Sequence, residues 1–185
     1  MGRITLVLGG ARSGKSTHAL RLAEEMGKPV TFIATAQAFD DEMSDRIQKH
    51  RAERPADWQT LEIPSAVAAH TDQIQSDVVV LDCVTLLVSN LLMQFVENDR
   101  VKESLFMQAA QQEIEALISV IHESERHWII VSNEVGLGLV PPYQMGRVYR
   151  DGLGWANQKL AKKAERVILM VAGIPVPIHE YKIRL

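Results

Sequence analysis

The octapeptide that decides the fold reads Gly9-Gly10-Ala11-Arg12-Ser13-Gly14-Lys15-Ser16. It fits the spacing G-x-x-x-x-G-K-[ST], and the segments on either side give that spacing its meaning. Residues 4–8 are apolar, as expected of a buried strand, and residues 17–26 have helical periodicity. A strand, a glycine-rich turn and a helix in this order predict a loop that binds phosphate.

The residue types within this loop indicate its chemistry. The glycines let successive backbone N–H groups turn towards a phosphate, and the helix N-terminus adds a partial positive charge. In such a loop Lys15 reaches the β and γ phosphates, and the Ser16 hydroxyl binds Mg²⁺. We therefore predict that residues 9–16 bind nucleotide, with Lys15 as a catalytic residue and Ser16 as a metal ligand. The alternative is a glycine-rich turn that fits the pattern by chance.

Composition limits the class of protein. With 185 residues and 46% hydrophobic content, residues 1–185 are expected to form a single domain with a sizeable core. A net charge of −3 gives no overall attraction to nucleic acid or to an anionic membrane. The single cysteine, Cys83, excludes an internal disulfide, and the apolar run at the N-terminus ends at Gly9, so we expect a cytoplasmic protein. The apolar residues 86–96 are too few to span a bilayer.

Apolar strands alternate with amphipathic helices along the chain. Strands are predicted at residues 4–8, 30–35, 58–64, 77–82, 128–132 and 167–172. Helices are predicted at residues 17–26, 40–54, 83–96 and 100–126, with a further helix that includes residues 147–157. This alternation predicts an α/β fold: one three-layer P-loop NTPase-like domain with a mostly parallel sheet. Pro175 and Pro177 argue against a central strand in the tail.

Two strand ends supply further candidate residues, because ligands of open α/β sheets bind at the carboxyl ends of the strands. Ala34, Thr35 and Ala36 end the second strand and are predicted to contact nucleotide, although an ordinary exit from strand to loop is the alternative. Asp82 follows four apolar residues, and an acid in this place holds Mg²⁺ in P-loop proteins. We predict it as a metal ligand that also contacts nucleotide; capping the following helix is its other possible role. Cys83 is interpreted as a buried small residue, since nothing nearby would lower its pKa.

The helix predicted at residues 40–54 begins with acids and ends with bases, which matches the helix dipole. Arg46, His50 and Arg54 are four residues apart and therefore share one edge of this helix. A solvated basic helix end with a capping histidine is the simpler interpretation. The phosphate loop elsewhere in the chain favours a second interpretation, in which the His50 imidazole lies beside a bound phosphate.

Several segments together resemble one enzyme family over essentially the full chain. They are GGARSGKS (9–16), IAT (33–35), DDEMSDRIQKHRAERPADW (40–58), LDCVTLLVSNLL (81–92), SNEVGLGLVP (132–141) and RDGLGWANQKLA (150–161). The family is that of the bifunctional adenosylcobinamide kinase and adenosylcobinamide-phosphate guanylyltransferase of cobalamin biosynthesis. The resemblance implies phosphorylation of the aminopropanol hydroxyl of adenosylcobinamide. It then implies transfer of GMP from GTP to adenosylcobinamide phosphate, giving adenosylcobinamide-GDP.

The resemblance also implies residue roles. In the family the histidine that precedes R-x-x-R-P carries GMP, and that position here is His50, in the pair Lys49-His50. A neutral imidazole nitrogen can attack a phosphate, and much of the imidazole is neutral at cytoplasmic pH. The nucleotide-binding residues expected from this region are Arg51, Ala52, Glu53, Arg54 and Glu62. The resemblance further implies ATP or GTP as phosphoryl donor, Mg²⁺ as cofactor, and a homo-oligomer with a trimer as the candidate.

Two other functions are compatible with the phosphate loop. A plain small-molecule kinase would use Lys15, Ser16 and Asp82 but would leave His50 without a role. A non-enzymatic nucleotide switch belongs to a different class, and the sequence lacks the N-K-x-D guanine motif of GTPase switches. The sequence does not single out a general base for phosphorylation.

Overall fold

The computed structural model describes residues 1–37, 41–52, 54–98 and 100–178. Within these residues one seven-stranded sheet has the order β3-β2-β4-β7-β1-β8-β9. Its strands are β1 (Arg3–Gly9), β2 (Val30–Ala34), β3 (Gln59–Glu62), β4 (Val78–Asp82), β7 (His127–Val131), β8 (Arg166–Val171) and β9 (Ile174–Pro177). All neighbours from β3 to β8 run parallel, and β9 pairs antiparallel with β8. The predicted mostly parallel sheet is confirmed, and the two prolines of the tail lie on an edge strand.

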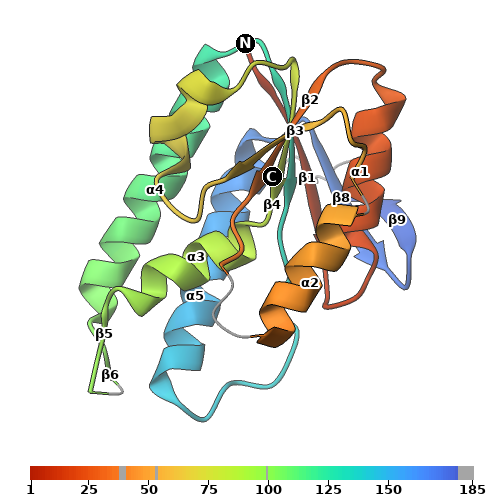
Figure 1. Cartoon of the computed structure of the whole chain (residues 1–185). Coiled ribbons are helices and arrows are strands. Elements are labelled where there is room, and N and C mark those ends of the chain that lie inside the picture. Colours follow the sequence, from red (N-terminus) through yellow and green to blue (C-terminus); the bar gives the residue numbers. More distant parts are fainter. Residues whose placement is uncertain (38–40, 53, 99, 179–185) are drawn as a thin grey trace.

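Helices cover both faces of the sheet and make the fold three-layered, as predicted (Figure 1). They are α1 (Lys15–Glu25), α2 (Asp41–Ala52), α3 (Val84–Met93), α4 (Glu103–Glu123) and α5 (Gln144–Lys163), with a 3₁₀ helix, η1, at Val67–Gln73. α1 and α2 lie on one side of the sheet, and α3, α4 and α5 lie on the other (Figure 1). Among the described residues, no helix is both long enough and apolar enough to cross a membrane.

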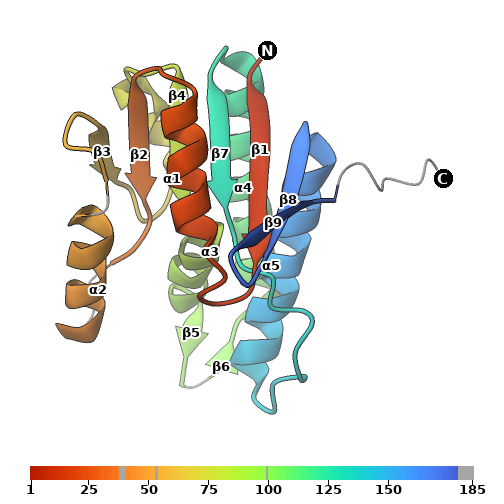
Figure 2. The ribbon, with the colours of Figure 1, turned by 90° about the vertical axis from the view of Figure 1, so that its right-hand side faces the viewer.

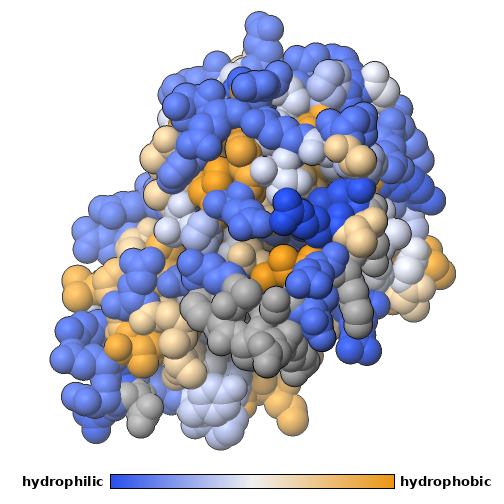
Figure 3. Space-filling view, in the orientation of Figure 1, coloured by the Kyte–Doolittle hydropathy of each residue, from blue (hydrophilic) through white to orange (hydrophobic). Residues whose placement is uncertain are grey.

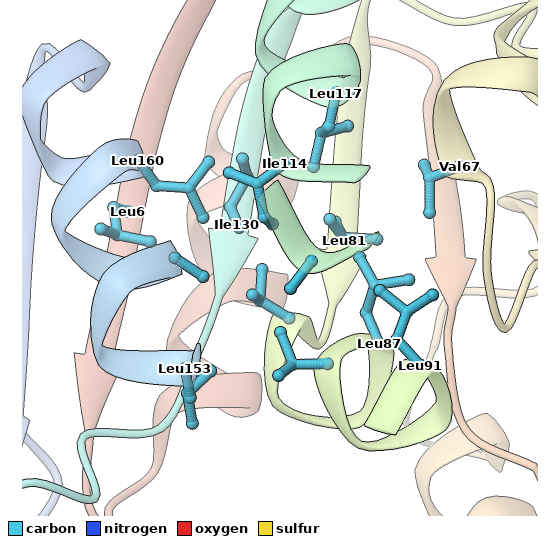
Figure 4. Close-up of a cluster of buried hydrophobic side chains, with 14 of the residues drawn as sticks. Leu6, Val67, Leu81, Leu87, Leu91, Ile114, Leu117, Ile130, Leu153 and Leu160 are labelled. Atoms are coloured by element: carbon cyan, nitrogen blue, oxygen red, sulfur yellow. The ribbon is translucent and has the colours of Figure 1, made fainter. Parts of the chain in front are cut away.

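Two hydrophobic cores follow from the alternation of side chains along the buried strands. Leu6, Leu81 and Ile130 point to the side of α3, α4 and α5, where Leu117 and Leu153 pack in the same cluster (Figure 4). Neighbouring strand residues such as Val7 and Val80 point to the other side and pack with Ala19 of α1. The central strands β1, β4 and β7 are therefore apolar on both faces, and this explains why their segments read as nearly continuous apolar runs.

The connection between α3 and α4 differs from the prediction. α3 ends at Met93 instead of Val96, because Val96–Glu97 (β5) pairs antiparallel with Arg100–Val101 (β6). Asn98 in the turn has a φ of 49°, a left-handed value that asparagine tolerates better than most residues. Strands of two residues are too short for an alternating pattern to reveal them, so the sequence indicated continuous helix instead.

Gly152 of α5 provides a test of helix packing. A β-carbon at this position would lie 2.7 Å from two ring atoms of Phe106 in α4, and Phe106 is fully buried. We expect Gly152→Ala to lower the free energy of unfolding by about 1–3 kcal/mol, as overpacking does in well-packed cores. Denaturant unfolding of the purified variant measures this loss.

Gly154 on the same helix is the matched control. A β-carbon there meets nothing within 4 Å, so Gly154→Ala should leave stability unchanged or raise it by up to about 1 kcal/mol through helix propensity. Equal free energies of unfolding for the two variants would contradict the close contact between Gly152 of α5 and Phe106 of α4.

Candidate functional site

The phosphate loop follows β1, which lies beside β7 in the sheet. The helices that come after these two strands pack on opposite faces of the sheet. β1 leads into α1 on one face, whereas the chain after β7 leads into α5 on the other (Figure 2). Ligands of open α/β sheets bind in the crevice that opens at the carboxyl ends of such strands. The fold therefore places the loop at the position where a ligand is expected.

Local geometry shapes the loop for an anion. Gly14 has a φ of 90°, which only glycine adopts readily, and α1 begins at the next residue. The Lys15 ammonium folds back over the loop, where Nζ donates to the Gly10 carbonyl at 2.5 Å and to Ser13 Oγ at 3.5 Å. Burial lowers the pKa of Lys15, and the nearby Cys83 and Asp82 oppose that effect. A buried ammonium at a helix N-terminus is a ready site for phosphate.

The loop is also held from outside. The backbone N–H of Gly173, in the turn between β8 and β9, donates to the Ser13 carbonyl at 3.0 Å. A β-carbon on Gly14 would lie 3.4 Å from the Gly173 α-carbon, so the two turns are in contact. The C-terminal hairpin therefore braces the phosphate loop.

Asp82 lies at the end of β4 and hydrogen-bonds with the Ser16 side chain. Burial raises the pKa of this carboxyl, and the Ser16 hydroxyl opposes the rise together with the nearby His50, Arg54 and Lys15. The hydroxyl and the carboxylate supply two adjacent hard oxygen ligands. Mg²⁺ is usually held by one or two such groups together with phosphate oxygens and water, so this pair fits Mg²⁺.

Thr35 fixes the end of β4 from the neighbouring strand. Its hydroxyl donates to the Cys83 carbonyl at 2.7 Å and accepts from the Cys83 N–H at 2.8 Å. The Thr35 carbonyl in turn accepts from the Asn90 amide at 2.8 Å. Because Cys83 follows Asp82 directly, these bonds orient the backbone that carries the carboxylate.

α2 extends beyond the ends of β2 and β3 (Figure 2). His50 of this helix and Arg54, which follows it, line the same cavity as the phosphate loop. The Arg54 guanidinium, just past the end of α2, lies 3.7 Å from the centroid of the Phe32 ring. Burial lowers its pKa, an effect that the Asp82 carboxylate opposes. Its Nε is buried and has no hydrogen-bond partner among the described residues. The stacked guanidinium also lines the cavity, where its charge suits an anion.

These groups surround a cavity of about 450 Å³, which is within the size range of small-molecule sites. Among the described residues, the charged and titratable side chains that line it are those of Arg12, Lys15, His50, Arg54 and Asp82, together with Cys83. The other lining residues are Ala11, Ser13, Gly14, Ser16, Thr17, Phe32, Ala34, Ala36, Ile47, Thr85, Leu86, Val131 and Asn133. Hydrophilic side chains cover much of the face seen in Figure 3, with separate hydrophobic patches between them. The excess of positive charge in the cavity suits a polyphosphate.

Most of the residues predicted from the sequence come together here. The cavity is lined by Ala11, Arg12, Ser13, Gly14, Lys15, Ser16, Ala34, Ala36, His50, Arg54 and Asp82. Its lining does not include Gly9, Gly10, Thr35, Arg51, Ala52 or Glu62. Glu53 and the side chain of Arg46 lie outside the described residues.

The predicted residues that miss the cavity do so for identifiable reasons. Gly9 is the last residue of β1, and Thr35 is fully buried with its hydroxyl bonded to Cys83. Arg51 is exposed and pairs with Glu62 at 3.9 Å between Nη1 and Oε1, so both lie outside the cavity wall. Successive residues on a helix point about 100° apart, so Arg51 cannot share the direction of His50.

Phe32 and Asn133 were not predicted as site residues. Phe32 appeared only as an apolar strand residue, although strand alternation places it on the same face as Ala34, which was predicted. Asn133 appeared only within the segment 132–141 that contributes to the family resemblance. Its position is fixed by a hydrogen bond of 2.8 Å from its backbone N–H to Thr85 Oγ1, which joins segments far apart in the sequence.

The thiol of Cys83 gives a prediction about reactivity. Burial, followed by the Asp82 charge, raises its pKa to about 12 from an ordinary value of 9.0. Only the thiolate is nucleophilic, so at pH 8 the folded protein should react with iodoacetamide about a thousandfold more slowly than an ordinary cysteine. Mass spectrometry of the alkylated protein measures the rate, with urea-unfolded protein as the control. Equal alkylation rates in the folded and unfolded protein would contradict a raised pKa for the Cys83 thiol.

A phosphate loop that faces an acidic strand end, in a three-layer α/β fold, defines a P-loop nucleotide-binding protein. The chain belongs to the cobinamide kinase / cobinamide phosphate guanyltransferase family, whose model matches residues 5–178. This match confirms the resemblance found in the sequence.

Named relatives agree with the family. The chain is 46% identical over 179 residues to the bifunctional adenosylcobalamin biosynthesis protein CobP of Pseudomonas aeruginosa, covering 94% of this chain and 95% of that protein. It is 42% and 41% identical to the bifunctional adenosylcobalamin biosynthesis proteins CobU of Escherichia coli and Salmonella typhimurium, each time covering 94% of this chain and 98% of the relative. A crystal structure of the RadB recombinase aligns with 91% of this chain and 74% of its own, at a TM-score of 0.49 and 14% identity.

Proposed function

We propose that this protein phosphorylates adenosylcobinamide and then transfers GMP from GTP to adenosylcobinamide phosphate, giving adenosylcobinamide-GDP. The observation that carries the proposal is that Lys15 of the phosphate loop and His50 of α2 line the same cavity. A kinase needs the first group, and a transferase with a covalent intermediate needs the second. Family membership supports the same pair of reactions.

In the kinase step the phosphate loop holds the donor triphosphate. The Lys15 ammonium neutralises charge on the β and γ phosphates, while Ser16 and Asp82 would hold Mg²⁺, which supplies further positive charge there. The aminopropanol oxygen forms a bond to the γ-phosphorus as the bond to the departing nucleoside diphosphate breaks. The hydroxyl proton is released to solvent. ATP and GTP both carry the required triphosphate.

In the guanylyl step an imidazole nitrogen of His50 attacks the α-phosphorus of GTP. A nitrogen–phosphorus bond forms, pyrophosphate leaves with the electron pair, and the imidazole releases a proton. An oxygen of adenosylcobinamide phosphate then attacks the same phosphorus, and the nitrogen–phosphorus bond breaks to restore the imidazole. Arg54 lines the same cavity and can neutralise phosphate charge during both transfers.

One experiment separates the proposal from its alternatives. Protein is incubated with Mg²⁺ and with ATP or GTP, together with adenosylcobinamide or adenosylcobinamide phosphate, and the products are identified by mass. We expect the phosphate from the first substrate and adenosylcobinamide-GDP from the second with GTP. A plain kinase would give only the phosphate, and a nucleotide switch would bind nucleotide without giving either product.

We also propose a homo-oligomer, with a trimer as the candidate from the family resemblance. Exposed apolar side chains gather between β7 and the first turn of α5: Leu137, Leu139, Val140, Tyr143 and Met145. The apolar helix α3 does not supply such a surface, because its Leu87 and Val88 are fully buried within the chain itself. Sedimentation at micromolar concentration should show the oligomer, and a monomer alone would contradict it.

We also propose that the protein works in the cytoplasm, because both proposed reactions use ATP or GTP.

A further inference from the structure

A second cavity, of about 510 Å³, lies at the same edge of the sheet, against α5. Its polar and aromatic lining comes from Glu134, Arg150, Asp151, Trp155, Asn157 and Gln158. α5 and α1 cover opposite faces of the sheet (Figure 1). The second cavity is lined mainly by α5, whereas the nucleotide cavity is lined by the phosphate loop and the start of α1. The proposed reactions leave this second cavity without a role.

The two cavities are adjacent. Asn133 lines the nucleotide cavity and the next residue, Glu134, lines the second one, with α-carbons about 3.8 Å apart. The Glu134 N–H donates to the Gly9 carbonyl at 3.0 Å, directly before the phosphate loop. The Asn157 amide of α5 donates to the Asn133 carbonyl at 2.9 Å. The wall between the cavities is therefore a hydrogen-bonded part of the phosphate-loop framework.

Their chemistry differs. Among the described residues, the nucleotide cavity is lined by four basic side chains and one carboxylate, whereas the second cavity is lined by the carboxylates of Glu134 and Asp151 and by one arginine, Arg150. The carboxamide oxygen of Asn157 is buried and accepts no hydrogen bond from the described residues. This oxygen does not reach the cavity surface, so the carboxylates that line the cavity decide which ligand it favours. Two carboxylates against one guanidinium favour a ligand that carries N–H and O–H donors and disfavour a triphosphate.

Trp155 adds an aromatic surface to these acceptors. The Lys159 ammonium lies 5.1 Å from the centroid of this ring, so it covers part of one face. The rest of the indole that lines the cavity can contact the body of a ligand, while the polar groups around it can bind the ligand's periphery. A cobinamide has this composition, because carboxamide side chains surround its macrocycle and an aminopropanol arm carries the reacting hydroxyl.

We propose that the second cavity binds the carboxamide periphery of the cobinamide acceptor and directs its aminopropanol arm across the strand ends to the phosphate loop. The inference rests on the proposed function, since it supplies the acceptor site that both transfers require. It explains why a cavity lined by carboxylates lies directly beside the cavity that suits a triphosphate, with Glu134 in the lining of one and Asn133 in the lining of the other.

Asp151 and Gln158 are the side chains to test, because both are exposed on α5 and can be replaced without disturbing the core. In the double variant Asp151→Ala/Gln158→Ala we expect the KM for adenosylcobinamide, and its Kd by calorimetry, to rise about tenfold or more through lost hydrogen bonds. The KM for nucleotide and the rate of GMP labelling of the protein should change less than twofold. Lys162→Ala, an exposed change on the same helix outside the cavity, is the control and should alter neither.

The outcomes separate this inference from the proposed function. An unchanged Kd and KM for the cobinamide in the double variant would overturn the acceptor site while leaving both activities in place. Wild-type protein that turns over nothing, but binds adenosylcobinamide more tightly than the double variant does, would overturn the function and support the site. Wild-type protein that does not bind adenosylcobinamide would overturn both.

Discussion

Changing Lys15 to alanine is expected to lower both the kinase rate and the guanylyl transfer rate by about a hundredfold or more. This is the scale on which losing one preorganised electrostatic contact acts in enzymes. The ammonium already lies over the phosphate loop, within 2.5 Å of the Gly10 carbonyl, so it needs little rearrangement to meet a bound phosphate. Both reactions depend on it because both begin with a nucleoside triphosphate.

Steady-state assays of each activity with saturating nucleotide measure this effect. Lys28→Ala is the matched control, since Lys28 is exposed and makes only a surface ion pair of 3.3 Å with Asp77. Denaturant unfolding must show that the Lys15 variant is folded. Full kinase activity in the folded variant would refute the placement of Lys15 at the phosphates.

Changing His50 to alanine is expected to abolish guanylyl transfer while leaving much of the kinase activity. Only the transfer reaction passes through a covalent intermediate, whereas phosphorylation needs the phosphate loop and the metal ligands. Some kinase loss is expected, because His50 and Arg54 line the same cavity and the change can shift bound nucleotide. The contrast between the two activities is therefore the result to measure.

Covalent labelling gives the sharper readout. Wild-type protein with Mg²⁺ and α-labelled GTP should acquire one GMP through a bond that is acid-labile and alkali-stable, as expected of a phosphoramidate. The His50 variant should acquire none. His70→Ala is the control, since His70 is partly exposed in η1 and bonds to the Ala66 carbonyl. GMP on another histidine, or transfer by the His50 variant, would refute His50 as nucleophile without refuting the family.

Sequence patterns were most informative where local chemistry and fold coincide. The strand, loop and helix around Lys15 follow from one motif, and Asp82 follows from an acid at the end of an apolar run. Spacing along α2 grouped His50 with Arg54, and both line the cavity. The short hairpin of β5 and β6 was missed because its strands are too brief to show a period.

Contacts between distant segments could not be predicted in the same way. The bond of Thr35 to Cys83 requires the register of β2 against β4, in which Ala34 lies opposite Asp82. The stacking of Arg54 on Phe32 requires the position of α2 relative to the sheet. The second cavity depends on the packing of α5 against the ends of β1 and β7, which no local pattern encodes.

The position of β1 in the sheet has a consequence for the order in which the protein can fold during synthesis. β1 is made first, yet its two neighbours are β7 and β8, which begin at residues 127 and 166. The turn that braces the phosphate loop through Gly173 is made later still. Until these segments leave the ribosome, the motif at residues 9–16 has no paired strand to support it, and its long-range contacts form slowly. The phosphate loop is therefore synthesised well before the strands that flank it, and its framework can be completed only after β8 and the turn at Gly173 have left the ribosome.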